Sequence, residues 1–251
     1  MAWTTSVPEL SAMALLKLVD ARQPVELRGM AKKIGLRVDQ VSSTGFDGAL
    51  LRLANRPRGI VAIRKTMESS RKRFTIAHEI GHYLLHDDVS PSCGEDEVGA
   101  GREKADEIER EANEFAGKLL MPSAVMRRIV VRFGCSIDTW ELVRDLFRVS
   151  LTAAAARCVE ETPEYLRAAL VVSKNGIVKY FVKSPAFSRY IEIDREIPSG
   201  SIAKELSRRG VRRKKGQVSA EVWIDIESGF LLQEESMLLP GYDTVLTLLT
   251  P

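Results

Sequence analysis

The chain has few cysteines and no long apolar run, and both absences exclude classes of protein. Cys93, Cys135 and Cys158 are widely spaced and form no C-x-x-C pair. This spacing argues against a disulfide framework or a zinc ribbon, and it suits a reducing cytoplasm. Near the N-terminus the apolar residues are interrupted by charges at Lys17 and Asp20. We therefore expect no signal peptide and no membrane span.

A strong excess of charge of one sign is also missing. The chain has 37 Lys and Arg against 34 Asp and Glu, a formal net charge of +3. Its global charge therefore gives no case for nucleic-acid binding. Apolar residues make up 45% of the 251 residues, which is enough for a packed core in one large domain or two to three small ones. The sequence carries no signal that sets an oligomeric state.

Only three histidines occur, and all lie in the run His78-Glu79-Ile80-Gly81-His82-Tyr83-Leu84-Leu85-His86. The first five residues have the pattern H-E-x-x-H. On a helix, positions four apart share a face, so His78 and His82 can reach one metal ion. Glu79 would stand beside that ion, where it can take a proton from water. Two histidines and a carboxylate leave one zinc position open, so the pattern predicts a zinc hydrolase.

The alternative is an accidental match, because H-E-x-x-H also occurs in unrelated helices. On a helical wheel, one broad arc is apolar and comprises Phe74, Ala77, Ile80, Gly81, Leu84 and Leu85. The opposite arc holds the three histidines and Glu79. A solvated helix face would normally carry Lys and Glu in place of clustered histidines, which favours the metal site.

A third protein ligand must come from elsewhere in the chain. His86 would lie about 12 Å along the helix axis from the first histidine, too far for the same ion. We predict instead that it caps the helix end, where a partly positive imidazole suits the dipole. A second helix is predicted to stop before Pro122, with Glu109 inside its apolar arc.

A carboxylate aimed at a core is costly unless it is paired or bound to metal. Glu109 is therefore the predicted third ligand, and Glu111 is the second choice. Asn113, four residues after Glu109, is predicted to orient a ligand through a hydrogen bond. In the simpler alternative, Glu109 only borders a solvated face.

These motifs resemble those of the ImmA/IrrE family of metallopeptidases. The residues that carry the resemblance are R-F-T-I-A-H-E-I-G-H (73–82), E-R-E-A-N-E-F-A (109–116) and L-L-M-P (119–122). The resemblance covers roughly residues 8–160 and implies a cytoplasmic, gluzincin-like peptidase of bacterial or phage origin. Members cut helix-turn-helix transcriptional repressors and so switch on stress-response or mobile-element genes. Carried over, His78 and His82 are zinc ligands, Glu79 is the catalytic base and Glu109 is the third ligand.

We expect an α+β fold with a zincin-like metallopeptidase domain over 1–122, a helical, helix-turn-helix-like segment over 123–162 and a β-rich domain over 163–251. In the first part, helices are predicted over 8–22 and 25–33, and strands over 36–38, 48–53 and 59–64. The strand at 60–64 is a candidate edge on which an extended substrate could lie by strand addition. An ordinary strand is the alternative.

The segment 145–157 has helix-turn-helix spacing, with Ser150 as the predicted N-cap of the second helix. It could contact DNA, but its Ala-rich helix offers few side chains for base edges. In the resembling family this segment commonly packs as structural support. Further on, strands are predicted over 168–172, 177–182, 220–225 and 244–249, with a short helix near 202–209. The resemblance implies a sensor-like domain similar to a GAF fold here, although no motif secures it.

A dense basic run follows that helix and is predicted to form a loop. It comprises Arg208, Arg209, Arg212, Arg213, Lys214 and Lys215. Such a run could engage nucleic acid or an acidic partner, but a solvated turn is its commoner meaning. Cys93 lies in the predicted loop between the two metal-binding helices. There it could be a redox-sensitive thiol or a competing ligand, whereas a plain surface cysteine is the simpler interpretation.

The leading hypothesis is a Zn²⁺-dependent endopeptidase acting on a protein, specifically a transcriptional repressor. Its oxyanion partner would be Tyr83, Tyr180 or an arginine. The second hypothesis is a DNA-binding transcription regulator with a structural zinc site. Glu79 discriminates between them, because a structural site has no use for a base beside the metal.

Overall fold

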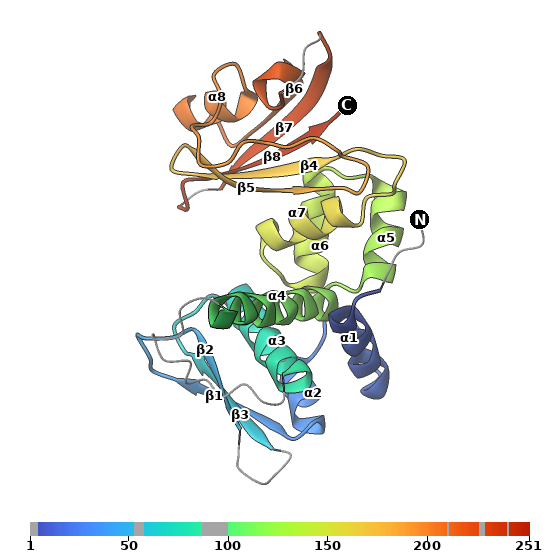
Figure 1. Ribbon diagram of the computed structural model, residues 1–251, viewed down its shortest axis with the longest axis vertical. Coiled ribbons are helices and arrows are strands. Elements are labelled where there is room, and N and C mark those ends of the chain that lie inside the picture. Colours follow the sequence, from blue (N-terminus) through green and yellow to red (C-terminus); the bar gives the residue numbers. More distant parts are fainter. Residues whose placement is uncertain (1–4, 53–57, 87–99, 210, 226–228, 240) are drawn as a thin grey trace. The chain divides into compact units, whose positions relative to one another are not determined.

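The structure is a computed structural model that describes residues 5–52, 58–86, 100–209, 211–225, 229–239 and 241–251. The chain separates into two compact units. The N-terminal unit comprises Met1–Pro122 with Asp145–Ser150, and the C-terminal unit comprises Ser123–Arg144 with Leu151–Pro251. Helices and sheets occur in both, so the fold is α+β as predicted (Figure 1). In the part of the chain that is described, no helix is both long and apolar enough to span a membrane.

The N-terminal unit contains the predicted helices and strands in the predicted order. They are α1 (Val7–Leu18), α2 (Leu27–Lys33), β1 (Leu36–Val41), β2 (Gly48–Arg52), β3 (Gly59–Arg64), α3 (Ser69–Leu85) and α4 (Ala100–Leu120). Local signals set several of the helix ends. Ser6 caps α1 by accepting a hydrogen bond from the Glu9 amide, and α4 ends shortly before Pro122 because proline cannot continue a helix.

The three strands of this unit form one sheet in the order β1-β3-β2. β1 runs parallel to β3, and β2 runs antiparallel to it. The prediction that residues 60–64 form an edge was therefore wrong, because β3 is the central strand. Its mostly buried side chains fit a strand that is flanked on both sides, and β1 and β2 are the edges.

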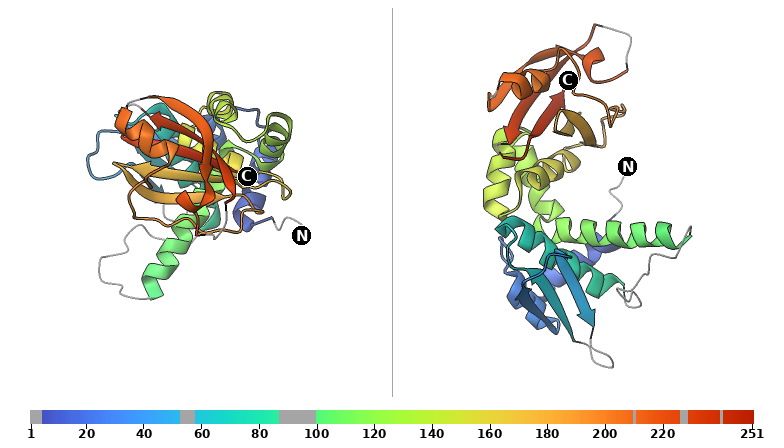
Figure 2. Two further views of the ribbon diagram at one scale, coloured as in Figure 1. Left: turned by 90° about the horizontal axis from the view of Figure 1, so that it is seen from above. Right: turned by 90° about the vertical axis from the view of Figure 1, so that its left-hand side faces the viewer.

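Helix α3 packs against the sheet and against α4 (Figure 1, Figure 2). The two helices approach closely at Gly81, where an added Cβ would lie only 3.3 Å from the Cα of Ala112 and 3.0 Å from the ring of Phe115. Glycine and alanine at these positions bring the two backbones together, as the small residues in the sequence suggested. α1 also packs against α4, and its side chains Ala12 and Leu15 are buried.

The C-terminal unit begins with helices and continues into a five-stranded sheet. Its elements are α5 (Ser123–Phe133), α6 (Ile137–Phe147, up to Arg144 in this unit), α7 (Leu151–Glu160), β4 (Ala169–Lys174), β5 (Ile177–Lys183), α8 (Ile202–Arg209), β6 (Arg213–Ser219), a 3₁₀ turn η1 (Ala220–Val222), β7 (Leu231–Leu239) and β8 (Thr244–Thr250). The order is β5-β4-β8-β7-β6, with every neighbouring pair antiparallel. Asn175 and Gly176, both at positive φ, form the predicted hairpin turn between β4 and β5.

Helices are associated with both halves of this sheet. α8 packs on β6, β7 and β8, and α7 packs on β4 and β5 (Figure 1). Buried residues of the strands, of α8 and of the segment before α8 form one apolar core, which includes Val171, Leu206, Trp223 and Leu249. The helical segment thus shares a unit with the β-rich region, while the predicted boundary between them near 162 stays a prediction.

One strand prediction in this unit was wrong, and the strands β6 and β7 were not predicted. Residues 220–225 form a 3₁₀ turn and its continuation, because Trp223 and Ile224 turn into the core instead of pairing with a neighbouring strand. β7 was missed because its central residues Glu234, Glu235 and Ser236 are polar. All three are buried and partnered, so they do not produce the alternation by which a strand is recognised in sequence.

Candidate metal centre

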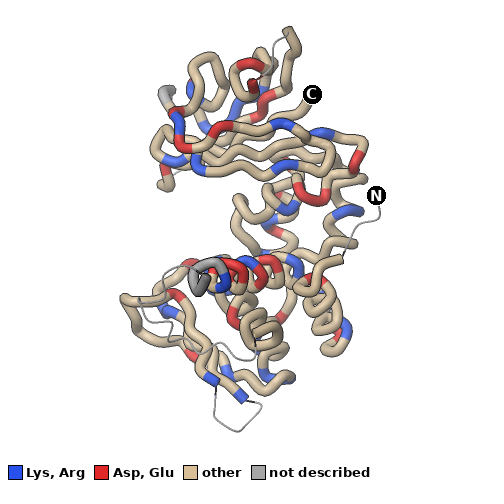
Figure 3. The backbone as a smooth tube through the Cα atoms, in the orientation of Figure 1, with Lys and Arg blue, Asp and Glu red and all other residues tan. Residues whose placement is uncertain are grey.

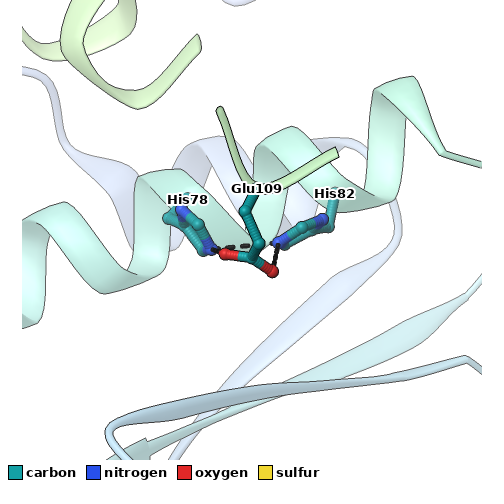
Figure 4. A group of neighbouring side chains, drawn as sticks. All are labelled: His78, His82 and Glu109. Atoms are coloured by element: carbon teal, nitrogen blue, oxygen red, sulfur yellow. Dashed lines mark hydrogen bonds and ion pairs between the residues drawn. The ribbon is translucent and has the colours of Figure 1, made fainter. Parts of the chain in front are cut away.

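Two histidines of α3 and one glutamate of α4 come together at a single point (Figure 4). The register of α3 buries Ile76, Ala77 and Ile80, so that His78 and His82 project together from the opposite side of the helix. Glu109 reaches them from the N-terminal half of α4. The structure therefore brings together the three residues that the sequence singled out as ligands.

The spacing of the three side chains fits one small divalent cation. The Nε2 atoms of His78 and His82 are 2.9 Å apart. Glu109 places one carboxylate oxygen 3.3 Å from the first and the other 3.2 Å from the second. Tetrahedral zinc ligands about 2.0–2.1 Å from the ion lie about 3.3 Å from one another. Two imidazoles and a carboxylate are also the donor set that zinc takes when one position stays open.

Glu109 is more exposed than its position on the wheel suggested. Its side chain is 59% exposed, so the expectation of a carboxylate inside the apolar arc was wrong. The buried face of α4 begins at Ala112 and continues through Phe115 and Ala116, whereas none of residues 104–111 is buried. Glu109 is thus oriented by the two histidines, without enclosure in the core.

Both histidines are also held through their second ring nitrogen. The Nδ1 atom of His78 lies 3.0 Å from the side-chain oxygen of Asn113, which is where the sequence placed an orienting amide. The Nδ1 atom of His82 lies 3.2 Å from the Nδ1 atom of His86. The amide oxygen of Asn113 accepts, so it favours a proton on Nδ1 of His78 and leaves Nε2 of that ring available as a ligand.

Glu79 lies beside the cluster in an enclosed position. Its exposure is only 7%, and a Cβ added to Gly48 of β2 would lie 2.7 Å from its Oε1 atom. Only glycine lets β2 approach the helix this closely. Burial, together with the nearby Glu109 carboxylate, raises the pKa of Glu79 to about 7. A carboxyl group near neutrality is suited to both accepting and releasing a proton.

Burial has the opposite effect on the two histidines, because it disfavours a charged imidazole. It lowers the pKa of His82 to about 4, with the neighbouring His78 adding to the shift. The pKa of His78 is lowered chiefly for the same reason, although Glu109 partly offsets the effect. Neutral imidazole is the form that binds a metal, so the environment favours ligation.

Arg52 of β2 is a residue of this site that the sequence did not reveal. Its Nη2 group donates to the carbonyl oxygens of His82, Tyr83 and His86, at 2.9, 3.1 and 2.7 Å. A cation there satisfies the last carbonyl groups of α3 and complements its dipole. Nothing near Arg52 in the sequence tells which helix end it reaches.

The other predicted site residues lie elsewhere or stay untested. Tyr83 has the Arg52 guanidinium 5.0 Å above its ring, and Tyr180 belongs to the C-terminal unit, so the oxyanion role stays a prediction. Cys93 lies outside the described residues.

The basic run is not a loop throughout, because β6 begins at Arg213. Arg213 forms ion pairs with Asp138 and Glu235, and Lys214 pairs with Glu205. Arg212 and Lys215 are exposed, whereas the side chains of Arg208 and Arg209 lie outside the described part of the structure. Basic and acidic residues are interspersed over this unit (Figure 3), which does not favour a purely cationic patch.

The histidines of the H-E-x-x-H pattern and a glutamate from a second helix thus form a group that could hold a metal ion. Residues 31–159, about half of the chain, match the family model described as the IrrE N-terminal-like domain of peptidase family M78. The chain belongs to this family of metallopeptidases, as the resemblance in the sequence predicted.

Two curated relatives carry the same description, radiation response metalloprotease IrrE. The chain is 30% identical over 104 residues to the protein from Deinococcus radiodurans and 32% identical over 121 residues to that from Deinococcus deserti. The matched parts are 41% and 46% of this chain, but only 32% and 41% of those longer proteins.

Among solved structures, a Mycobacterium tuberculosis transcriptional regulator is similar, with a TM-score of 0.67 over 97% of this chain and 75% of that one. The sequence identity is 13%, so this likeness concerns the fold alone.

Proposed function

We propose that this protein is a zinc-dependent endopeptidase that cleaves a helix-turn-helix transcriptional repressor. The observation that carries the proposal is the cluster of His78, His82 and Glu109, whose ligand atoms all lie within 4.8 Å of one another with the buried Glu79 beside them. Membership of a metallopeptidase family supports the same conclusion. Zinc is the ion that this combination of imidazoles and a carboxylate fits best.

The residues of the site divide the chemistry of peptide hydrolysis between them. A zinc ion held by His78, His82 and Glu109 would polarise a peptide carbonyl and make water a stronger nucleophile at neutral pH. Glu79 takes the proton of the attacking water and passes it to the leaving amine. Asn113 holds the ring of His78 in one orientation. The exposed Glu109 leaves the cluster accessible from solvent.

We propose that the substrate backbone binds along the edge strand β2. Among the described strands only β3 pairs with β2, so its other edge keeps backbone groups available. Gly48 at the start of β2 lies against Glu79. A substrate segment that adds to β2 in extended form would therefore pass the catalytic carboxylate. This edge replaces the strand at 60–64, which lies in the middle of the sheet.

Cleavage of a repressor in the cytoplasm would release the genes that it silences. The two Deinococcus relatives are described as radiation response proteins, which supports a role in a stress response. Mobile-element genes are the other class of target that the family resemblance implies. A cytoplasmic location agrees with the cysteines, since Cys135 and Cys158 are both free thiols in the structure.

A DNA-binding regulator with a structural zinc site is less well supported. The second helix of the helix-turn-helix-like segment, α7, packs on β4 and β5 with Ala154, Ala155 and Cys158 fully buried. Its one arginine, Arg157, is also buried and pairs with Glu160 and Glu161. This helix thus presents no cationic side chain for a DNA groove.

The decisive test replaces the base without touching the ligands. Glu79→Gln should bind zinc as the wild type does but lose cleavage by roughly 10²–10⁴-fold, the usual contribution of general acid–base catalysis. The product of a neighbouring repressor gene is offered as the substrate, and its fragments are identified by mass spectrometry. Zinc is measured by elemental analysis. Removing zinc with a chelator should stop cleavage by the wild type.

Glu107→Gln is the matched control, because Glu107 is an exposed residue of α4 that pairs with Arg110. It should change neither zinc content nor cleavage. Glu109→Gln should lower zinc content. If Glu79→Gln cleaves as fast as the wild type, or if cleavage survives the chelator, the protein is not a zinc peptidase of this kind.

A further inference from the structure

His86 and Glu111 form a second line of contacts behind one of the metal ligands. The Nδ1 atom of His86 lies 3.2 Å from Nδ1 of His82, and its Nε2 atom lies 2.9 Å from a carboxylate oxygen of Glu111. The His86 side chain is only 6% exposed, and the Glu111 side chain is 34% exposed. Glu111, His86 and His82 thus form a line of hydrogen-bonding contacts from α4 to one of the proposed metal ligands.

These contacts are more than a helix cap. As the residue that ends α3, His86 needs only its backbone amide, which donates to the carbonyl oxygen of His82 at 3.2 Å. Arg52 holds the same turn by donating to the carbonyl oxygens of His82 and His86. The buried ring of His86 is therefore free of any capping task, and its two nitrogens face one ligand and one carboxylate.

The Glu111 carboxylate, at the end of this line of contacts, determines which ring nitrogens carry protons. A carboxylate only accepts hydrogen bonds, so Nε2 of His86 must carry a proton toward Glu111. In the neutral ring, Nδ1 of His86 then has none and accepts a hydrogen bond from Nδ1 of His82. His82 in turn keeps the lone pair of its Nε2 atom for the cluster.

We propose that His86 and Glu111 are positioning residues that hold His82 in the tautomer with the proton on Nδ1, so that Nε2 is presented to the metal. The proposal rests on the metal site of the proposed function. It makes the two ligands equivalent: His78 is oriented by Asn113, and His82 is oriented by the pair His86–Glu111. Asn113 and Glu111 both belong to α4, the helix that also supplies Glu109, whereas His86 ends α3.

The tautomers can be read directly from the metal-free protein. The chain has only three histidines, so a long-range ¹H–¹⁵N correlation spectrum would resolve each of their ring nitrogens. The spectrum is recorded at about pH 8. The Glu109 carboxylate and Nε2 of His78 also face Nε2 of His82, at 3.2 and 2.9 Å, and favour a proton there in the metal-free protein. We therefore expect the proton of His86 on Nε2, and a larger Nδ1-protonated share of His82 in the wild type than in His86→Leu.

Two substitutions of His86 separate positioning from packing. His86→Leu keeps the buried volume but removes the acceptor, so His82 should shift toward the Nε2-protonated tautomer and zinc should bind roughly 10–100-fold more weakly. His86→Gln offers an amide oxygen to Nδ1 of His82 and should retain most of the affinity. Affinity is measured by competition with a zinc-binding dye, and folding by circular dichroism.

Glu111→Ala should lower zinc affinity in the same direction as His86→Leu. Glu107→Ala on the exposed part of α4 is its control and should bind zinc like the wild type. The proposal is wrong if folded His86→Leu keeps both the Nδ1 proton of His82 and wild-type affinity, or if His86→Gln is no better than His86→Leu. Failure of wild-type protein to bind zinc would instead overturn the proposed function, while the tautomers would still report on the contacts.

Discussion

Glu79 is a carboxylic acid in a place where its charge is costly. Its side chain is buried, and a second carboxylate, Glu109, lies nearby. Both effects disfavour the ionised form, so its pKa rises from 4.5 to about 7 in the folded protein. The unfolded chain ionises near 4.5, and this difference makes the stability of the metal-free protein depend on pH.

We predict that the metal-free wild type loses stability relative to Glu79→Gln as the pH rises. A raised pKa gives stability that is fully present below pH 4.5 and is lost as the pH passes through about 7. Between about pH 5 and pH 8 the loss should be about 2–3 kcal/mol, at 1.36 kcal/mol for each unit of pKa. Urea unfolding in the presence of a chelator measures it.

His82 makes the stability of the metal-free protein depend on pH in the opposite direction. Its pKa is depressed from 6.5 to about 4, so its own stabilising effect is lost as the pH falls through that range. Both proteins keep His82, so the difference between them isolates Glu79. Unfolding free energies that stay parallel from pH 5 to pH 8 would show that the folded protein does not raise the pKa of Glu79.

The site residues that share one helix could be predicted from their spacing in the sequence. A residue that reaches the site from another helix or strand could not be predicted in this way. His78 and His82 are four positions apart on one helix, so their convergence follows from the sequence. Glu109 was predicted from its place in the apolar arc of a second helix, but its burial was misjudged because a wheel does not show how far along α4 the buried face extends. Arg52 escaped notice because only the fold brings β2 to the end of α3.

At the scale of elements, the site depends on how closely α3 and α4 approach. Ligands on two helices can meet one ion only if the backbones come near, and Gly81 opposite Ala112 provides the space. The Ala112 backbone cannot give way as the end of a flexible side chain could. An added side chain at Gly81 should therefore push the helices apart.

Gly81→Val should destabilise the N-terminal unit by about 1–3 kcal/mol, the usual cost of overpacking a core. It should also weaken zinc binding, because Glu109 moves away from the two histidines. Thermal unfolding and zinc titration measure the two effects. Gly45→Val is the control, since no atom lies within 4 Å of a Cβ added there. Wild-type stability and affinity in the Gly81 variant would mean that close approach of the helices is not required.

Strand positions were more predictable than strand neighbours. β1, β2 and β3 lie where the apolar runs indicated, yet their order places β3 in the centre. That order comes from tertiary pairing, in which β1 and β3 are parallel. β7 shows the converse case: its Glu234 accepts hydrogen bonds from the Trp223 indole and the Ala203 amide. Hydrogen-bond partners from elsewhere in the sequence allow polar residues to be buried in a strand, although a local pattern of polar residues is typical of a loop.

For the molecule as a whole, the two compact units should respond separately to perturbation. The proposed zinc site lies in the N-terminal unit, because all three proposed ligands belong to it. A ligand that binds only the folded form stabilises by an amount set by its excess over Kd, about 4 kcal/mol at a 1,000-fold excess. We predict two unfolding transitions in calorimetry. Zinc should raise the midpoint temperature of one of them, and a chelator should lower the midpoint temperature of the same transition. A single transition shifted as a whole would contradict this independence.

The second transition can be identified by a substitution in the C-terminal unit. Arg213 joins α6 to the sheet, with bonds to Asp138 at 2.6 Å and to the buried Glu235 at 2.5 Å. Arg213→Met would leave the Glu235 carboxylate buried without this partner, at a cost of about 3–5 kcal/mol. Arg213→Met should therefore lower the midpoint temperature of the zinc-independent transition and leave that of the zinc-dependent transition unchanged. Lys215 is an exposed neighbour, so Lys215→Met should change neither midpoint. If Arg213→Met lowers the zinc-dependent transition as well, the folding of the metal centre depends on the C-terminal unit.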